Sequence, residues 1–198
     1  QPEEPQPEEP QPEEPQPERP APPPTGEVAL LANVQSALAT PPVISVARTM
    51  SHFGEHAAGW VALSGVGALL SRRRRSEWLL VAVGAVAAHA AAIAIKLVVR
   101  RARPNHPAVA VNVSTPSALS FPSAHATSTT AAAMLLCRAT RSPLPLVVVP
   151  LMALSRLVLG VHYPSDVVAG ALVGAAVAET VTRVAGPGRR QSSGDVGP

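Results

Sequence analysis

The stretch WLLVAVGAVAAHAAAIAIKLVVRRARP, residues 78–104, decides the fold. Its first 18 residues contain only one ionisable side chain, that of His89, and a helix of about 20 apolar residues crosses the hydrocarbon core of a bilayer. The stretch then ends in a cluster of cations that begins at Lys96 and stops at Pro104. We therefore expect a membrane-spanning helix that carries positive charge to one membrane surface.

Four further apolar segments predict a helical bundle around this one. They cover residues 53–70, 123–138, 144–161 and 164–184. Glycines four residues apart, such as Gly170 and Gly174, allow helices to pack closely in lipid. Residues 27–40 and 43–51 form two shorter amphipathic patterns, separated by prolines. The expected fold is all-α: a polytopic membrane helix bundle of about five transmembrane spans with N-terminal amphipathic helices.

The two ends of the chain differ in composition from this bundle. Residues 1–24 contain 11 of the 23 prolines, mostly in QPEEP repeats. Proline lacks a backbone donor and the glutamates repel one another, so residues 1–25 are expected to be a disordered tail. Residues 185–198, rich in Gly, Ser and Arg, are expected to be a flexible tail. The membrane domain is therefore expected to cover residues 26–184.

Composition excludes several classes of protein. A single cysteine, Cys137, cannot form an internal disulfide, and no His/Cys spacing matches a structural zinc site. Aromatic residues make up 3% of the chain and the basic residues stand in short clusters between apolar runs, so nucleic acid is not an expected partner. The bilayer is the expected environment, and no pattern indicates an oligomeric state.

Arginine clusters predict the orientation in the cell membrane. Four arginines at residues 72–75 follow the first span, and Arg138 and Arg141 lie at the end of the third. Arg183, Arg189 and Arg190 lie at and beyond the end of the fifth span. All three groups lie on one side of the membrane in this count, which the positive-inside rule assigns to the cytoplasm. The three motifs described next are then expected on the extracytoplasmic face.

The first motif is the cation cluster. Lys96, Arg100 and Arg103 stand at i, i+4 and i+7, which predicts that they share one helix face up to Pro104. Such a face suits an anion with several oxygens, and arginine adds a bidentate fork. Interfacial anchoring by snorkelling side chains is the simpler alternative for the cluster taken alone.

The second motif is Phe-Pro-Ser-Ala-His at residues 121–125. Proline and Ser123 are typical of a helix start, where free backbone N–H groups attract anions, and His125 falls in the first turn. An ordinary capping turn with an interfacial histidine is the alternative for this motif.

The third motif runs from Ser155 to Asp166. Arg156 lies inside an apolar run, where a charge indicates a functional site by default. His162 lies at the membrane edge and Asp166 one turn beyond, close enough to orient the imidazole. Alone, such a pair is as often structural as functional.

Together the three motifs read Lys-x6-Arg-Pro, Pro-Ser-x-His and Ser-Arg-x5-His-x3-Asp, in this order and on one membrane face. This combination resembles the type 2 phosphatidic acid phosphatase superfamily, the lipid phosphate phosphatases, over about residues 27–184. One position departs from the family pattern: Ala124 stands where glycine is common, which keeps the backbone N–H and narrows the pocket.

The resemblance implies a role for each motif residue. His162 would be the nucleophile that forms a phosphohistidine, Asp166 would orient it, and His125 would protonate the leaving alkoxide and then activate water. The residues that would bind the phosphoryl oxygens are Lys96, Arg103, Ser123 and Arg156. The family needs no metal or other cofactor, and the implied partner is a lipid-linked phosphate substrate.

The segment His-Phe-Gly-Glu-His at residues 52–56 and the run Phe-Pro-Ser-Ala-His-Ala-Thr-Ser-Thr-Thr at residues 121–130 resemble an actinobacterial branch of the superfamily. This resemblance implies decaprenylphosphoryl-5-phosphoribose, a precursor in cell-wall arabinan synthesis, as the expected substrate. A polyprenyl diphosphate or phosphatidylglycerophosphate phosphatase is the alternative within the family. From other classes, a vanadate-type haloperoxidase-like protein is disfavoured by the apolar spans, and a non-catalytic membrane protein by the complete set of motif residues.

Histidines also occur outside the three motifs. His52 and His56 are four residues apart, but the glutamate does not follow the first histidine as it does in zinc proteases. We expect an interfacial structural role or contact with the substrate head group there. His89, among alanines, is expected to make an interhelical hydrogen bond.

Overall fold

The computed structural model describes residues 22–186, and every regular element within that range is a helix. The helices are α1 (Gly26–Leu38), α2 (Pro41–Gly54), α3 (Ala58–Leu70), α4 (Arg75–Val99), α5 (Ala124–Thr140), α6 (Val148–Val158) and α7 (Pro164–Ala185). Short 3-10 turns precede α3, α4 and α6, at Glu55–Ala57, Arg72–Arg74 and Leu144–Val147. Most of both predicted tails lies outside the described residues, and the predicted division of the chain stays a prediction.

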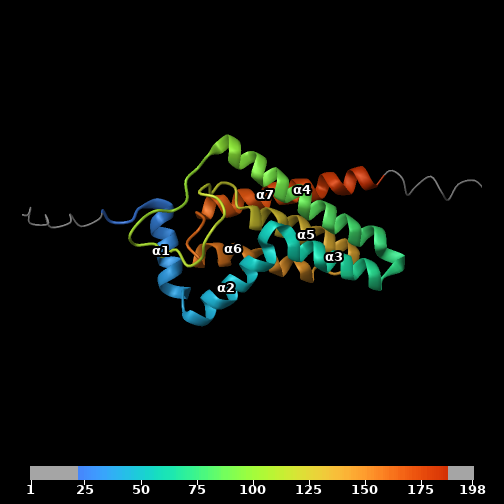
Figure 1. The fold of residues 1–198 in the computed structure, drawn as a ribbon, viewed down its shortest axis with the longest axis horizontal. Coiled ribbons are helices and arrows are strands. Elements are labelled where there is room, and N and C mark those ends of the chain that lie inside the picture. The colour runs from blue at the N-terminus through green and yellow to red at the C-terminus, as the bar shows by residue number, and fades with distance from the viewer. Residues whose placement is uncertain (1–21, 187–198) are drawn as a thin grey trace, which may run out of the picture.

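Helix α5 is the centre of the bundle. It packs most extensively on α4 and α7, and α3 covers α4; Figure 1 shows these helices running alongside one another, with α1 and α2 beneath one end. A Cβ at Gly174 would lie 2.3 Å from the carbonyl oxygen of Thr127, so glycine allows α7 to lie directly on α5. The packing seam expected from the glycine spacing is thus present.

The outer surfaces fit a lipid environment. Large apolar side chains are exposed along the bundle, for example Leu70 (82%), Val83 (56%) and Leu172 (67%). By length and composition, two helical stretches of the described chain can cross a membrane, Arg72–Val99 and Pro164–Ala185. Helices α1 and α2–α3, bent by 116°, add a third if they count as one span. The all-α membrane bundle is confirmed, while the number of five spans stays a prediction.

The expected continuous helix face from Lys96 to Arg103 is wrong. Helix α4 ends at Val99, where Arg100 adopts a left-handed φ of 53° and its N–H bonds to the Lys96 carbonyl. Beyond it the chain is extended, because Arg103 N donates to Ala118 O and Ser120 N to Arg101 O. Bonds to this distant loop replace the helical bonds that the local sequence favoured.

The first expected span is also interrupted. His56 and Ala57 have φ values of 50° and 59°, so α2 and α3 meet at a break instead of forming one helix from residue 53. The ring of Phe53 folds onto Gly59, where a Cβ would lie 2.4 Å from it. Helix α2, in turn, is longer than the predicted 43–51 pattern.

Four element ends meet at one end of the bundle. They are the C-terminal ends of α4 and α6 and the N-terminal ends of α5 and α7, joined on one side by residues 100–123 (Figure 1). The arginines at residues 72–75 lie at the opposite end, where Arg74 donates to the carbonyl of Ala139 at 2.9 Å. All three motifs therefore reach the same end.

Candidate active site

A cavity of about 370 Å³ opens at the end where the motifs meet. Five of the predicted site residues line it: Lys96, Arg103, His125, Arg156 and His162. The other two, Ser123 and Asp166, are fully buried behind its wall. Although 70 residues separate Lys96 from Asp166 in the chain, the structure brings the whole predicted set to one place.

The two ring nitrogens of His162 face different groups: Nε2 faces Arg103 and Nδ1 faces Asp166. The Arg103 Nη1 lies 3.3 Å from Nε2, and because a guanidinium only donates, Nε2 must carry the free lone pair. The Nδ1–Asp166 Oδ2 distance is 3.6 Å, longer than a hydrogen bond, and Nδ1 has no other partner within residues 22–186. Burial lowers the pKa of His162 to about 4, against the opposing contact with Asp166, so the ring is neutral near pH 7.

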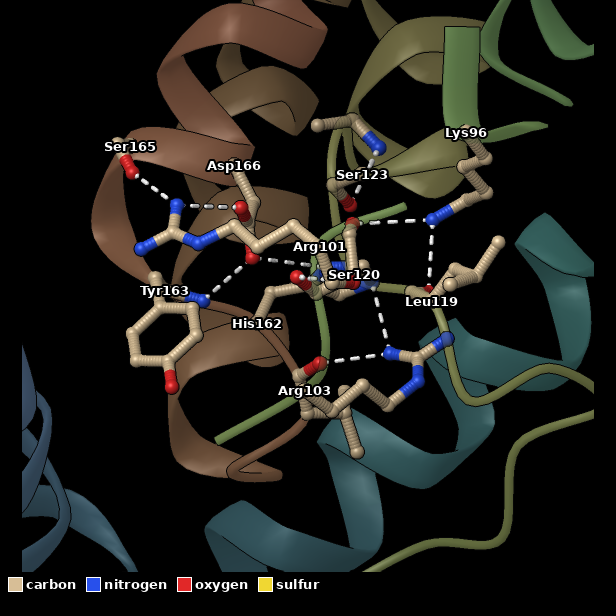
Figure 2. A network of polar contacts seen from close by, with 12 residues as sticks. Lys96, Arg101, Arg103, Leu119, Ser120, Ser123, His162, Tyr163, Ser165 and Asp166 are labelled. Carbon is tan, nitrogen blue, oxygen red and sulfur yellow. Dashed lines mark hydrogen bonds and ion pairs between the residues drawn. The ribbon is translucent and has the colours of Figure 1, made fainter. Parts of the chain in front are cut away.

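Two cations of the first motif are fixed by backbone carbonyls. Lys96 Nζ donates to Leu119 O and Ser120 O at 3.0 and 2.9 Å (Figure 2). Arg103 donates through Nε to Ser117 O and through Nη1 to Val161 O, at 2.8 and 2.6 Å. Carbonyls orient these groups without neutralising them, so both keep their full positive charge toward an anion.

Arg156 and His125 are connected through α2. Arg156, 2% exposed, donates from Nη1 to Ser51 Oγ at 3.0 Å and from Nη2 to Ala47 O at 3.3 Å. His125 Nε2 lies 3.0 Å from Ser51 O, and since a carbonyl only accepts, Nε2 carries the hydrogen. Ser51 thus positions both residues, a role that nothing in its local sequence indicated.

Ser123 begins α5 as its N-cap. Its Oγ accepts from Ala126 N at 3.4 Å, and its own N–H donates to Asp166 O at 2.9 Å. The hydroxyl is therefore engaged in the cap and does not line the cavity, whereas Ala124 and His125 do. First-turn N–H groups have no intrahelical partner, so the helix start itself offers donors at the cavity wall.

Arg101 is a second residue of this site, after Ser51, that the motifs missed. Its Nη1 donates to Asp166 Oδ1 at 2.8 Å and to Ser165 Oγ at 2.6 Å (Figure 2). Its Nη2 pairs with Glu27 Oε2 at 2.6 Å. The guanidinium also lies 4.0 Å from the centroid of the Tyr163 ring. Asp166 Oδ2 accepts from Tyr163 N at 2.8 Å, so the carboxylate is held from both sides.

The spacing in the cation cluster singled out Arg100, whereas the structure uses the adjacent Arg101. Arg100 was expected on the shared helix face, but it caps α4 with an exposed side chain and does not line the cavity. Only the extended course of residues 101–103, set by bonds to residues 118–120, turns Arg101 toward Asp166 and Arg103 toward His162. Alternation along an extended strand would have indicated this, once the helix end was known.

Three further histidines also reach the cavity. His52, His56 and His89 line it, and within residues 22–186 no group of three or more His, Cys, Asp or Glu side chains could hold a metal ion. His89 was predicted to make an interhelical hydrogen bond, but its Nδ1 makes none: this atom is buried without a partner in the described chain. Its ring instead lies against that of His56.

This arrangement of cations, two histidines and a buried carboxylate at one end of a membrane bundle agrees with comparisons to known proteins. The model of the PAP2 superfamily matches residues 77–189, more than half of the chain. The chain belongs to the PAP2 superfamily, which confirms the resemblance seen in the three motifs.

Individual relatives extend this result. The chain is 60% identical over 168 residues to the decaprenylphosphoryl-5-phosphoribose phosphatase of Mycobacterium tuberculosis, covering 84% of this chain and 95% of that protein. It is 65% identical over 148 residues to the phosphatase of the same name from Mycolicibacterium smegmatis, covering 74% and 82%.

A solved structure is similar in fold. The transmembrane PAP2-type phosphatidylglycerolphosphate phosphatase from Bacillus subtilis matches with a TM-score of 0.62 and 22% identity, over 79% of this chain and 85% of that one. At this identity the match concerns the fold, which is that of a transmembrane PAP2 phosphatase.

Proposed function

We propose that the chain is a membrane phosphatase that removes the 5-phosphate from decaprenylphosphoryl-5-phosphoribose. The observation that carries the proposal is the neutral imidazole of His162, whose free Nε2 lies beside Arg103 in a cavity lined by cations. The names of the mycobacterial relatives support the choice of substrate.

In the first step, Nε2 of His162 attacks phosphorus, and the bond to the C5 oxygen of the pentose breaks. Lys96, Arg103 and Arg156 bind the phosphoryl oxygens, because they line the same cavity and are held by uncharged groups. The N–H groups at the start of α5, shaped by the Ser123 cap, supplement them. The leaving alkoxide takes the Nδ1 proton of His125, whose ring enters this step doubly protonated because the bound phosphate dianion lies beside it.

In the second step, His125 removes a proton from water, which attacks the phosphohistidine and releases inorganic phosphate. The Nε2–H of His125 is engaged by Ser51 O, so Nδ1 is the nitrogen that exchanges this proton. No step needs a metal ion.

Asp166 and Arg101 act through His162. The carboxylate stabilises the Nδ1–H tautomer and the positive charge that develops on the ring during attack. Arg101 is a positioning residue: it holds Asp166 Oδ1 and, with Glu27, joins the start of α7 to α1. The carboxylate is thereby kept in one orientation.

The site is proposed to face the extracytoplasmic side. Exposed arginines gather at the opposite end of the bundle, as the positive-inside rule requires of a cytoplasmic end. The polyprenyl chain then stays in the outer half of the bilayer while the pentose phosphate enters the cavity.

The test is phosphate release by the purified protein in detergent from four substrates: decaprenylphosphoryl-5-phosphoribose, a polyprenyl diphosphate, phosphatidylglycerophosphate and phosphatidic acid. We expect the highest kcat/KM for the first, unchanged in excess EDTA, and no release by His162→Ala. A higher kcat/KM for the polyprenyl diphosphate or for phosphatidylglycerophosphate would show that the proposed substrate is wrong. A loss of activity in EDTA that Mg²⁺ restores would overturn metal independence.

A further inference from the structure

The wall of the cavity contains a pair of histidines that the proposed mechanism does not use. His56 and His89 both line the cavity that contains His162, and their rings are 5.6 Å apart at an interplanar angle of 65°. The two residues come from different elements, the break before α3 and the middle of α4. Packing alone would not require two imidazoles at such a site, where apolar side chains are the usual choice.

The backbone at His56 is held in an uncommon conformation. The φ of His56 is 50° and that of Ala57 is 59°, values that non-glycine residues seldom adopt. The break lies against the proposed proton donor, since a Cβ at Gly54 would be 2.7 Å from the His125 ring. Strained positions of this kind are common where a side chain must be presented to a ligand.

His89 has hydrogen-bonding capacity to spare. Its Nδ1 is buried, and no partner for it exists in the described chain. A buried polar atom without a partner is unfavourable, so its presence at a cavity wall indicates that the ring has a role toward a bound group. His56 is exposed at the open side of the same cavity, where its ring nitrogens are accessible.

The position along α4 identifies the part of the substrate that would reach these rings. His89, Ile93 and Lys96 line the cavity at i, i+4 and i+7, so His89 lies about 10 Å deeper along the helix axis than the proposed phosphate ligand Lys96. In the proposed substrate, the reacting phosphate is followed by the pentose, the phosphodiester and the polyprenyl chain. The pentose is therefore the group next to the histidine pair.

We propose that His56 and His89 form a subsite for the pentose hydroxyls of the lipid-linked substrate and so select it over lipid phosphates without a sugar. This inference rests on the proposed function. An imidazole that both donates and accepts is suited to a hydroxyl, which does the same, and a site built to bond a hydroxyl discriminates strongly against analogues that lack it.

The experiment measures kcat/KM for decaprenylphosphoryl-5-phosphoribose, its 2-deoxyribose analogue and phosphatidic acid, with wild type, His89→Leu and His56→Asn. Leucine fills the space of the imidazole, and asparagine tolerates the positive φ at position 56. The control is His106→Asn, a histidine outside the cavity. Ratios between substrates within one preparation do not depend on the fraction of folded protein.

We expect each variant to lower the ratio of kcat/KM for the ribose substrate to that for phosphatidic acid at least tenfold, and the control to leave it unchanged. In wild type, kcat/KM for the 2-deoxyribose analogue should be lower than that for the ribose substrate. This difference between the two substrates should be smaller in His89→Leu. If wild type prefers the ribose substrate and both variants keep that preference, the subsite is overturned and the proposed function stands. If wild type prefers phosphatidic acid, the proposed substrate itself fails, and the subsite fails with it.

Discussion

The two ends of the bundle carry the same basic residue types in opposite surroundings. At the cavity end, Arg156 is 2% and Lys96 8% exposed, and both donate to carbonyls or hydroxyls of other elements. At the other end, Arg73, Arg138 and Arg141 are exposed. A solvated arginine contributes to orientation in the membrane, whereas a buried one needs partners and is costly unless it serves a function.

This contrast teaches that burial, and not residue type, separates binding groups from anchors. In the sequence, Arg100 and Arg103 belong to one cluster, yet Arg100 is exposed and Arg103 points at His162. Substitutions at the cavity end should therefore remove activity, and those at the arginine-rich end should spare it. The predictions below test this from the largest effect to the smallest.

His162→Ala should abolish phosphate release, by at least about 10⁴-fold, because no other group at the cavity replaces the attacking Nε2. The measurement is release of inorganic phosphate from the lipid substrate in detergent. The matched control is Arg73→Gln at the opposite end, which should retain wild-type activity. Comparable losses in both variants would remove the distinction between the two ends.

Asp166→Asn should lower kcat roughly 10²–10³-fold while leaving a measurable rate, because the nucleophile remains and only its tautomer and developing charge lose support. Single-turnover kinetics would locate the loss in formation of the phosphohistidine. A rate equal to that of wild type would show that the carboxylate has only a structural role.

Arg101→Gln should lower kcat at least about tenfold, but less than Asp166→Asn does, since one charge-assisted contact to Asp166 is lost, one that is worth about 1.5–3 kcal/mol. KM should stay unchanged because Arg101 does not line the cavity. Glu27→Gln, which removes only the outer partner, is the matched comparison and should have a smaller effect. A rise in KM with constant kcat would instead place Arg101 among the substrate ligands.

The imidazole of His162 should stay neutral as the pH falls until about 4, below the ordinary pKa of 6.5, because its burial disfavours the charged ring. Protonation removes the Nε2 lone pair, so the nucleophile is lost as the pH decreases through this lower value. The measurement is a ¹⁵N NMR titration in micelles, following the signal that is missing in His162→Ala. A midpoint near 6.5 would contradict it.

Cysteine labelling tests the orientation without any expected change in activity. Val111 is 61% exposed in the loop at the cavity end, so Val111→Cys in a chain with Cys137→Ala offers one accessible thiol. An impermeant reagent should label it in intact cells. Labelling only after lysis would place the cavity on the cytoplasmic side.

The sequence by itself determined the helical membrane class and the residues of the three motifs. Apolar runs encode helices locally, and the spacing within each motif places its members near one helix end. The course beyond α4 could not be read in this way, because helix propensity continues past Val99. Backbone bonds to residues 118–120 end the helix there.

Only the tertiary structure brought Arg101 to Asp166, Ser51 to Arg156 and His56 to His89. These partners are 65, 105 and 33 positions apart in the chain. Local patterns report which groups a helix presents, but such contacts depend on how helices pack and where they break. The packing of α2 against α6, and the break before α3, therefore decided the shape of the cavity around the motif residues.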